Sequence, residues 1–90
     1  MKEQFIIYFK DEEDQYQAEV KAFELDNSMV YDVYYSLVPH VYLVRRMQIY
    51  AAVGNGSFTH WRQRITNKDE KPLPEEFVEA IGSAIENAQL

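Results

Sequence analysis

The sequence predicts an α+β fold: a five-stranded antiparallel meander sheet followed by one C-terminal helix packed on one face. Most of the chain alternates apolar and polar residues with a period of two, which is typical of strands. The stretch 74–89 changes to a period of three to four, which is typical of an amphipathic helix. The chain has 90 residues, enough to bury a modest core. We therefore expect a single domain over residues 1–90.

The first two strands are expected at 4–10 and 15–25, separated by the acidic run 11–14. Their apolar residues fall on one face when the acidic run forms the connecting loop. The four adjacent carboxylates lack the alternate spacing, the glycine and the distal glutamate of a calcium loop, so we expect a solvated hairpin tip and no metal. The resulting pairs are Phe9 with Tyr16, Ile7 with Ala18, and Phe5 with Val20.

The third and fourth strands are expected at 29–38 and 41–53. Asp26, Asn27 and Ser28 have turn composition and precede the third strand. Pro39 lacks an N–H group, so it belongs to the break between the two strands. The alternation of the fourth strand fails at its arginine pair. A bulge at Arg45–Arg46 would turn both arginines outward and place Tyr42 and Val44 on the core face.

The fourth strand and a fifth at 57–66 are joined by Gly54, Asn55 and Gly56, for which two registers are open. A two-residue turn would mix apolar and charged residues on both faces. A three-residue loop with a bulge gives one apolar face and one basic-aromatic face, and we prefer it. The apolar face then holds Met47, Ile49, Ala51, Val53, Trp61 and Ile65. The opposite face, the candidate binding face, holds Arg46, Gln48, Tyr50, Phe58, His60, Arg62 and Arg64.

The helix is expected over 74–89, with Pro74 at its first position and acids in its first turn. Gly82 lies inside it, where glycine costs about 1 kcal/mol relative to alanine, so we expect a close approach to the sheet there. We expect Trp61 and Ile49 to face the helix. Their expected partners on the helix are Phe77, Ile81 and Ile85.

The sheet face away from the helix receives many apolar residues by the same alternation. They are too many for a face that is wholly in water. Either the sheet curls and buries part of this face, or a partner covers it. The residues are Ile6, Tyr8, Phe23, Leu25, Val30, Tyr34, Tyr50 and Phe58.

The net charge of −6 is unevenly distributed. Residues 33–68 contain four arginines, one lysine and no acid, whereas 1–32 and 69–90 are acidic. Such blocks either pair with one another across the sheet or frame a binding patch. The chain has no cysteine, which fits a reducing compartment. The apolar run after the N-terminus is too short for a signal peptide or a membrane span, and we expect a soluble, cytoplasmic protein that does not enter membranes.

The residues of catalytic chemistry are scarce. The only histidines, His40 and His60, are twenty residues apart, and no serine stands in a nucleophile elbow. Without cysteine, the zinc ligand spacings are missing. The segment Gly54–Ser57 leads into a strand rather than a helix, so it is not a phosphate loop. We expect no enzyme activity, no cofactor and no metal.

Two functions remain. The first is a non-enzymatic protein-interaction module that self-associates as a homodimer, or binds another protein, through the open sheet face. The alternative is single-stranded nucleic-acid or polyanion binding on the candidate binding face, where arginines alternate with aromatic residues. The acidic net charge argues against nucleic acid. Pairing of the arginines with an acidic partner segment, or with Glu19 and Asp32 of the same sheet, is the more ordinary explanation.

Overall fold

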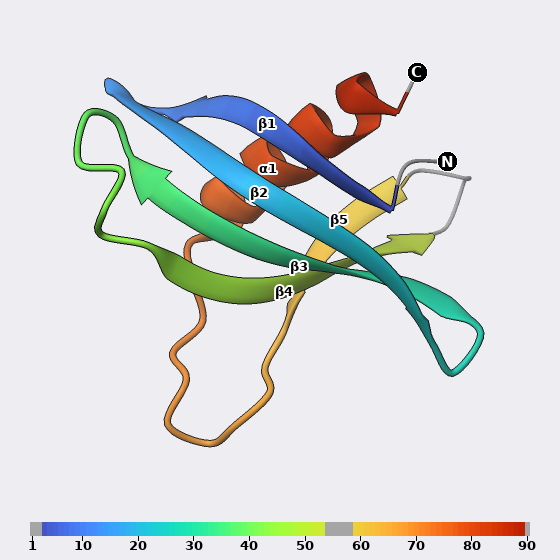
Figure 1. Ribbon diagram of the computed structural model, residues 1–90. Helices are drawn as coiled ribbons and strands as arrows, with labels where there is room; N and C mark the ends of the chain where they lie inside the picture. Colours follow the sequence, from blue (N-terminus) through green and yellow to red (C-terminus); the bar gives the residue numbers. More distant parts are fainter. Residues whose placement is uncertain (1–2, 54–58, 90) are drawn as a thin grey trace.

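The structure is a computed structural model that describes residues 3–53 and 59–89. Five antiparallel strands form one open sheet in meander order, and one helix crosses its inner face (Figure 1). The predicted α+β fold is therefore confirmed. The elements are β1 (Gln4–Asp11), β2 (Asp14–Leu25), β3 (Ser28–Leu37), β4 (Arg45–Val53), β5 (Thr59–Arg64) and α1 (Glu75–Ala88).

Two tight turns connect the first three strands. β1 and β2 pair in the predicted register, with Phe9 opposite Tyr16, and the ladder continues one pair beyond the prediction. Only two residues are left for the turn, and Glu12 adopts a positive φ of 56°. The β2–β3 turn is also two residues long, and both Asp26 and Asn27 have positive φ. Two consecutive left-handed residues match the twist of the flanking strands, and asparagine and aspartate tolerate that conformation well.

The core lies between the inner sheet face and α1, which packs mainly against the two edge strands, β1 and β5. The sheet thus curves around the helix, as Figure 1 shows. Trp61 and Ile49 belong to one buried cluster with the apolar side of the helix, as predicted. The fully buried side chains at its centre are Val20, Val33, Ile49, Ile81 and Ile85.

The contact between β5 and α1 explains the glycine inside the helix. A Cβ atom at Gly82 would lie 2.0 Å from Cγ of Trp61, so only glycine leaves room for the indole ring. The indole Nε1–H donates to Oε1 of Glu86 at 2.8 Å, and the backbone N–H of Trp61 donates to Oε1 of Glu79 at 3.2 Å. The helix therefore covers part of the free edge of β5 as well as its inner face.

The segment 41–44, predicted as strand, is a correction. β4 begins at Arg45, which pairs with Tyr35, and the ladder continues without a bulge. The N–H of Leu43 donates to the carbonyl of His40 in a local turn, and Pro39 has no N–H to donate. Both facts oppose an extension of the β3–β4 ladder. Tyr42 and Val44 are therefore exposed rather than part of the core.

The β4–β5 pairing also differs from the predicted one. Ala51 lies opposite Trp61 and Val53 opposite Thr59, two residues away from the pairing of a three-residue loop. Because side chains alternate, a shift of two keeps every residue on its predicted face. The Gly54–Gly56 turn lies outside the described residues. β5 ends at Arg64, so Ile65 does not continue the apolar face and is exposed instead.

The connection from β5 to the helix is held by two side chains. Glu70 accepts hydrogen bonds from the backbone N–H and hydroxyl of Thr66 and from the amide of Gln63. The same Gln63 accepts a bond from the backbone N–H of Leu73 at 2.7 Å. The helix begins at Glu75, with Pro74 as the preceding cap residue rather than the first helical residue.

Candidate functional site

One polar row crosses the outer face of the sheet from edge to edge. The residues of this row lie directly opposite one another in four consecutive strand pairs. Direct cross-strand neighbours on one face are close enough to interact. The polar row consists of Gln4, Lys21, Asp32, Gln48 and Arg64.

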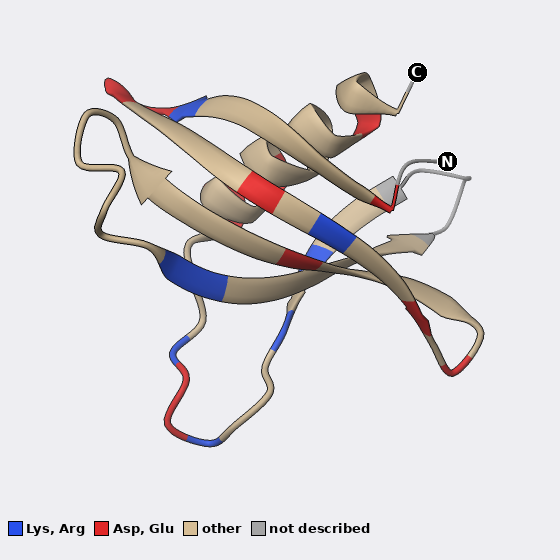
Figure 2. Cartoon of the chain, in the orientation of Figure 1, with Lys and Arg blue, Asp and Glu red and all other residues tan. Residues whose placement is uncertain are grey.

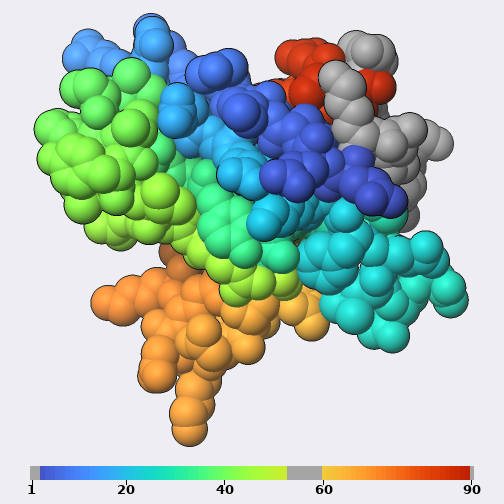
Figure 3. All heavy atoms as spheres, in the orientation of Figure 1, coloured from blue at the N-terminus to red at the C-terminus, as the bar shows by residue number. Residues whose placement is uncertain are grey.

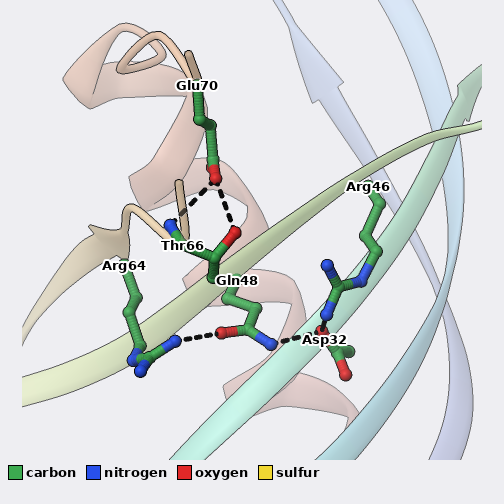
Figure 4. Close-up of polar contacts among 6 residues, drawn as sticks. All are labelled: Asp32, Arg46, Gln48, Arg64, Thr66 and Glu70. Carbon is green, nitrogen blue, oxygen red and sulfur yellow. Dashed lines mark hydrogen bonds and ion pairs between the residues drawn. The ribbon is translucent and has the colours of Figure 1, made fainter. Parts of the chain in front are cut away.

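Side chains of the polar row bind one another on β3, β4 and β5 (Figure 4). Arg64 donates to Oε1 of Gln48 at 2.8 Å, and Nε2 of Gln48 donates to Oδ1 of Asp32, also at 2.8 Å. Arg46, from the next row, donates to the same aspartate oxygen at 2.7 Å in an ion pair. Asp32 is thus a shared acceptor between an amide and a guanidinium. Arg46 also lies 6.0 Å from the ring centroid of Tyr34.

Because of these contacts, some residues of the candidate binding face are bonded within the sheet and others are exposed. Gln48 is buried and bonded on both sides of its amide, so it is not available to a ligand. Arg46 and Arg64 are bonded within the sheet, while His60 and Arg62 are exposed on β5. Phe58 lies outside the described residues. The expected pairing with Asp32 is present for Arg46, whereas Glu19 bonds Gln4 of β1 at 2.6 Å instead.

Tyr50 and the exposed residues of β5 border an open hollow of about 540 Å³. His60 and Arg62 come from the strand, and Glu75 comes from the first turn of α1. Among the described residues that line this hollow, an anionic ligand would meet the guanidinium of Arg62 and the carboxylate of Glu75. The balance of charge is therefore close to neutral, and it gives a phosphate little net attraction.

Part of the apolar outer face is covered by neighbouring side chains of the same face. Val30 is buried although it points away from the helix. It lies directly opposite Phe23 on β2 and Tyr50 on β4, which flank it on both sides. These two neighbours, with Leu25 and Tyr34, are half-buried. The expectation that this face is not wholly in water therefore holds for Val30, which its neighbours cover.

The remaining apolar exposure gathers in one place. Among the described residues, seven of the eight exposed large hydrophobic side chains lie on β1 or in the β3–β4 connection, and Ile65 is the eighth. Their exposed fractions range from 41% to 75%. We call this set the apolar surface. It consists of Ile6, Tyr8, Val38, Val41, Tyr42, Leu43 and Val44.

Two hollows join the two parts of the apolar surface. One, of about 360 Å³, is lined by Ile6 from β1 together with Val41 and Val44 from the connection. The other, of about 460 Å³, is lined by Tyr8 and Val38. Figure 3 shows the connection, in green to yellow-green, projecting beside the blue residues of β1 and β2. The connection carries no aspartate, glutamate, lysine or arginine (Figure 2). Two charged residues of β2, Glu19 and Lys21, line the first of the two hollows.

The area of the apolar surface is unusual for a monomer. Seven side chains at these exposed fractions present on the order of 600 to 800 Å², taking about 150 to 250 Å² for a whole aromatic group and less for an aliphatic one. The largest apolar patch of a typical monomer covers about 300 to 600 Å². Each partner in a standard protein interface contributes about 800 Å². The apolar surface is thus close in size to one side of an interface.

Sequence reasoning identified Ile6 and Tyr8 but missed the connection. The run Val41-Tyr42-Leu43-Val44 has the composition of a strand. Its apolar residues led to the prediction that Tyr42 and Val44 belong to the core face. The available signal was Pro39, which already marked a break in the ladder. A break before four apolar residues is equally compatible with an exposed loop.

The inner end of the same connection borders the aromatic end of the core. Leu43 and His40 line a hollow of about 430 Å³ together with Tyr16, Tyr35 and Phe77. The rings of Tyr16 and Tyr35 meet that of Phe77 edge-on at 5.2 and 5.3 Å between centroids. Burial raises the pKa of both tyrosines, with nearby acids adding to the effect on Tyr16. Both hydroxyls are therefore neutral at physiological pH.

Metal-binding groups do not converge in the part of the chain that the structure describes. His40 lies 3.4 Å from the hydroxyl of Tyr42, through Nδ1, and His60 is exposed on β5. Within residues 3–53 and 59–89, no three histidine or acidic side chains come together as a metal site would require. Over the same residues, the helix is too short and too polar to cross a membrane.

Comparisons of the chain with protein-family models, with curated proteins and with solved structures find no match. The surfaces described above are therefore the basis for assigning a function.

Proposed function

We propose that this protein is a non-enzymatic interaction module that self-associates as a homodimer through the apolar surface. The observation that carries the proposal is the concentration of exposed hydrophobic side chains on β1 and residues 38–44. An apolar area on the order of 600 to 800 Å² is similar to the area of about 800 Å² that each partner contributes to a standard interface.

A second copy is the favoured partner because the charges beside the apolar surface are few and of both signs. Glu19 and Lys21 line the hollow between Ile6 and Val41. An acidic chain of net charge −6 repels its own copies at long range. The β3–β4 connection has no aspartate, glutamate, lysine or arginine, so its own side chains add no repulsion, and salt screens the more distant charges. Apolar cores with charged rims are the usual anatomy of protein interfaces.

Sedimentation equilibrium at micromolar concentration tests the proposal. The wild type should show about twice its monomer mass of 10.7 kDa. A double variant, Val41→Ser with Tyr42→Ser, should sediment as a monomer, because it removes exposed apolar area and no core contact. Ile65→Ser is the matched control, since Ile65 is exposed but lies outside the apolar surface, and it should remain dimeric. A monomeric wild type, or a double variant that stays dimeric, overturns the proposal.

A second candidate, polyanion binding, rests on the exposed Arg62 and His60 beside Tyr50. An aromatic ring, a guanidinium and an imidazole around one hollow suit a stacked base and its phosphate. The bonds of Arg46 and Arg64 within the sheet count against it. Titration with a single-stranded oligonucleotide at low salt separates the candidates: binding that Arg62→Gln abolishes would favour the polyanion, and no binding would remove it.

A further inference from the structure

The two edge strands of the sheet, β1 and β5, differ in the hydrogen bonding of their outward backbone groups. On β5, the outward N–H of Trp61 is bonded to Glu79, and Gln63 bonds the segment that follows the strand. On β1, the carbonyl of Glu3 accepts the N–H of Ala22 of β2. Since antiparallel partners alternate between bonded and non-bonded pairs, the odd-numbered residues of β1 face β2 and the even-numbered residues face outward.

The outward groups of β1 are those of Gln4, Ile6, Tyr8 and Lys10. In the described part of the chain, no hydrogen bond reaches the backbone groups of these four residues from outside the β1–β2 ladder. All four side chains are exposed. Proteins usually protect a sheet edge with proline, a bulge, inward charges or a covering segment. β1 has a regular eight-residue ladder and charged groups only toward its ends.

We propose that a second copy docks edge to edge on β1, antiparallel, so that the two sheets form one continuous ten-stranded sheet. The inference rests on the proposed self-association and specifies its geometry. The outward groups restrict the register, because bonded pairs must join even-numbered residues, and among such registers we choose the one that pairs all four. A twofold axis at Ile7 places Ile6 opposite Tyr8 of the partner and Lys10 opposite Gln4 of the partner. All four even-numbered residues of each strand then find partners.

This register brings apolar groups together at the centre. Ile6 and Tyr8 of both copies form one cluster on the outer face, continuous with the hollows that lead to Val38, Val41 and Val44. This register also places like charges together at the ends of the paired strands, where Glu3 lies opposite Asp11 of the partner. Repulsion between charges at the rim of an interface is small and screened by salt. Apolar contact at the centre therefore dominates.

The inner face also admits a second copy. Ala80, Ala84 and Ala88 follow one another at four-residue spacing on the side of α1 away from Trp61, and all three are half-buried. Ala88 lines the same hollow as Gln4 and Ile6, which places this side of the helix beside β1. Small side chains let neighbouring helices approach closely. The helices of the two copies therefore have room beneath the joined strands.

Disulfide cross-linking tests the register, because the chain has no native cysteine. Ile6→Cys and Tyr8→Cys proteins are mixed under mild oxidation. Opposite residues of a bonded pair have Cα atoms about 5.5 Å apart, within disulfide range. Two Ile6→Cys chains, or two Tyr8→Cys chains, place their cysteines on a diagonal at about 7 to 8 Å, which is too far. The mixed disulfide should exceed either homodimer several-fold.

A backbone test uses the outer edge itself. Lys10→Pro removes an outward N–H without touching a bond to β2, so the monomer should keep its fold, as circular dichroism can verify. Two intermolecular hydrogen bonds are lost across the twofold axis, and the dimer dissociation constant should rise about tenfold. Lys10→Ala, which keeps the N–H, is the matched control and should change the constant less than about threefold.

The outcomes separate this inference from the proposed function. Preferred mixed disulfides together with weakened Lys10→Pro dimers support edge docking. A wild-type dimer without mixed-disulfide preference, and with Lys10→Pro unaffected, overturns edge docking but leaves self-association through the apolar surface standing. A wild type that stays monomeric overturns both.

Discussion

The indole ring of Trp61 occupies the space that a side chain at position 82 would need. A Cβ atom at Gly82 would come within 2.0 to 2.4 Å of three ring atoms. The indole Nε1–H donates to Glu86 and the backbone N–H of Trp61 donates to Glu79, so both the ring and the strand are bonded to the helix. Strand β5 and helix α1 are therefore in close contact at Trp61 and Gly82, and the helix covers the inner face of the curved sheet there.

Gly82→Ala should destabilise the protein despite the better helix propensity of alanine. The propensity gain is about 1 kcal/mol, while overpacking against a ring with no free space costs about 1 to 3 kcal/mol or more. Chemical denaturation should show a net loss of stability. Ser83→Ala, on the exposed side of the same helix, is the control and should be neutral or slightly stabilising. A Gly82→Ala protein at least as stable as the wild type would refute the packing described.

Ile81→Ala should cost about 2 to 5 kcal/mol in free energy of unfolding, because Ile81 is fully buried and the deletion leaves a cavity. Urea melts at neutral pH measure the difference. Ile65→Ala removes the same atoms from an exposed position and should change stability by less than about 0.5 kcal/mol. Equal effects of the two substitutions would show that Ile81 is not in the core.

The arginines of the candidate binding face should differ in their effect on stability. Arg46→Gln breaks the ion pair with Asp32 and should cost about 0.2 to 1 kcal/mol, as expected for a partly exposed pair. The loss should shrink at high salt. Arg62→Gln is the control, because Arg62 is exposed on β5. If Arg62→Gln destabilises as much as Arg46→Gln, the shared aspartate does not explain the role of Arg46.

Glu70 should make the protein less stable in acid. The backbone N–H of Thr66, and then the side chain of Gln63, lower the pKa of this carboxyl below its ordinary value of 4.5. A carboxyl whose pKa falls on folding contributes stability above its unfolded pKa, and the contribution is lost as pH drops through the folded pKa. Melts of wild type and Glu70→Gln should therefore differ at neutral pH and converge toward pH 3. A difference that persists unchanged in acid would contradict this assignment.

Periodicity predicted the order of the elements and their faces, and the alternation of apolar residues predicted the first hairpin register. The inner face was predictable because one face is buried, and a one-residue slip would expose Phe5, Ile7 and Phe9 together. The exact β4–β5 pairing was not predictable, since a shift of two leaves the faces unchanged. Neither composition nor period could show that residues 41–44 leave the sheet, because that depends on the bond from Leu43 to His40.

The candidate site was predicted in part. The arginines, Tyr50 and His60 share the outer face as expected. Pairing with Asp32 was one of the explanations that the sequence offered for the arginines, and Arg46 forms that pair. The burial of Gln48 could not be read from the sequence, because it depends on two neighbours that the register supplies. Residues 38–44 of the apolar surface were missed for the same reason that the fourth strand was predicted too long. Apolar residues were expected to be buried, although that rule holds in one direction only.

An amide NMR concentration series tests the central claim, that β1 and residues 38–44 form the contact with a second copy. On dilution from millimolar to micromolar protein, chemical shifts should change at Ile6, Tyr8 and Lys10 and across 38–44, while the amides of Arg62 and Arg64 on β5 stay constant. Shifts that do not change with concentration, or changes confined to β4 and β5, would contradict the claim.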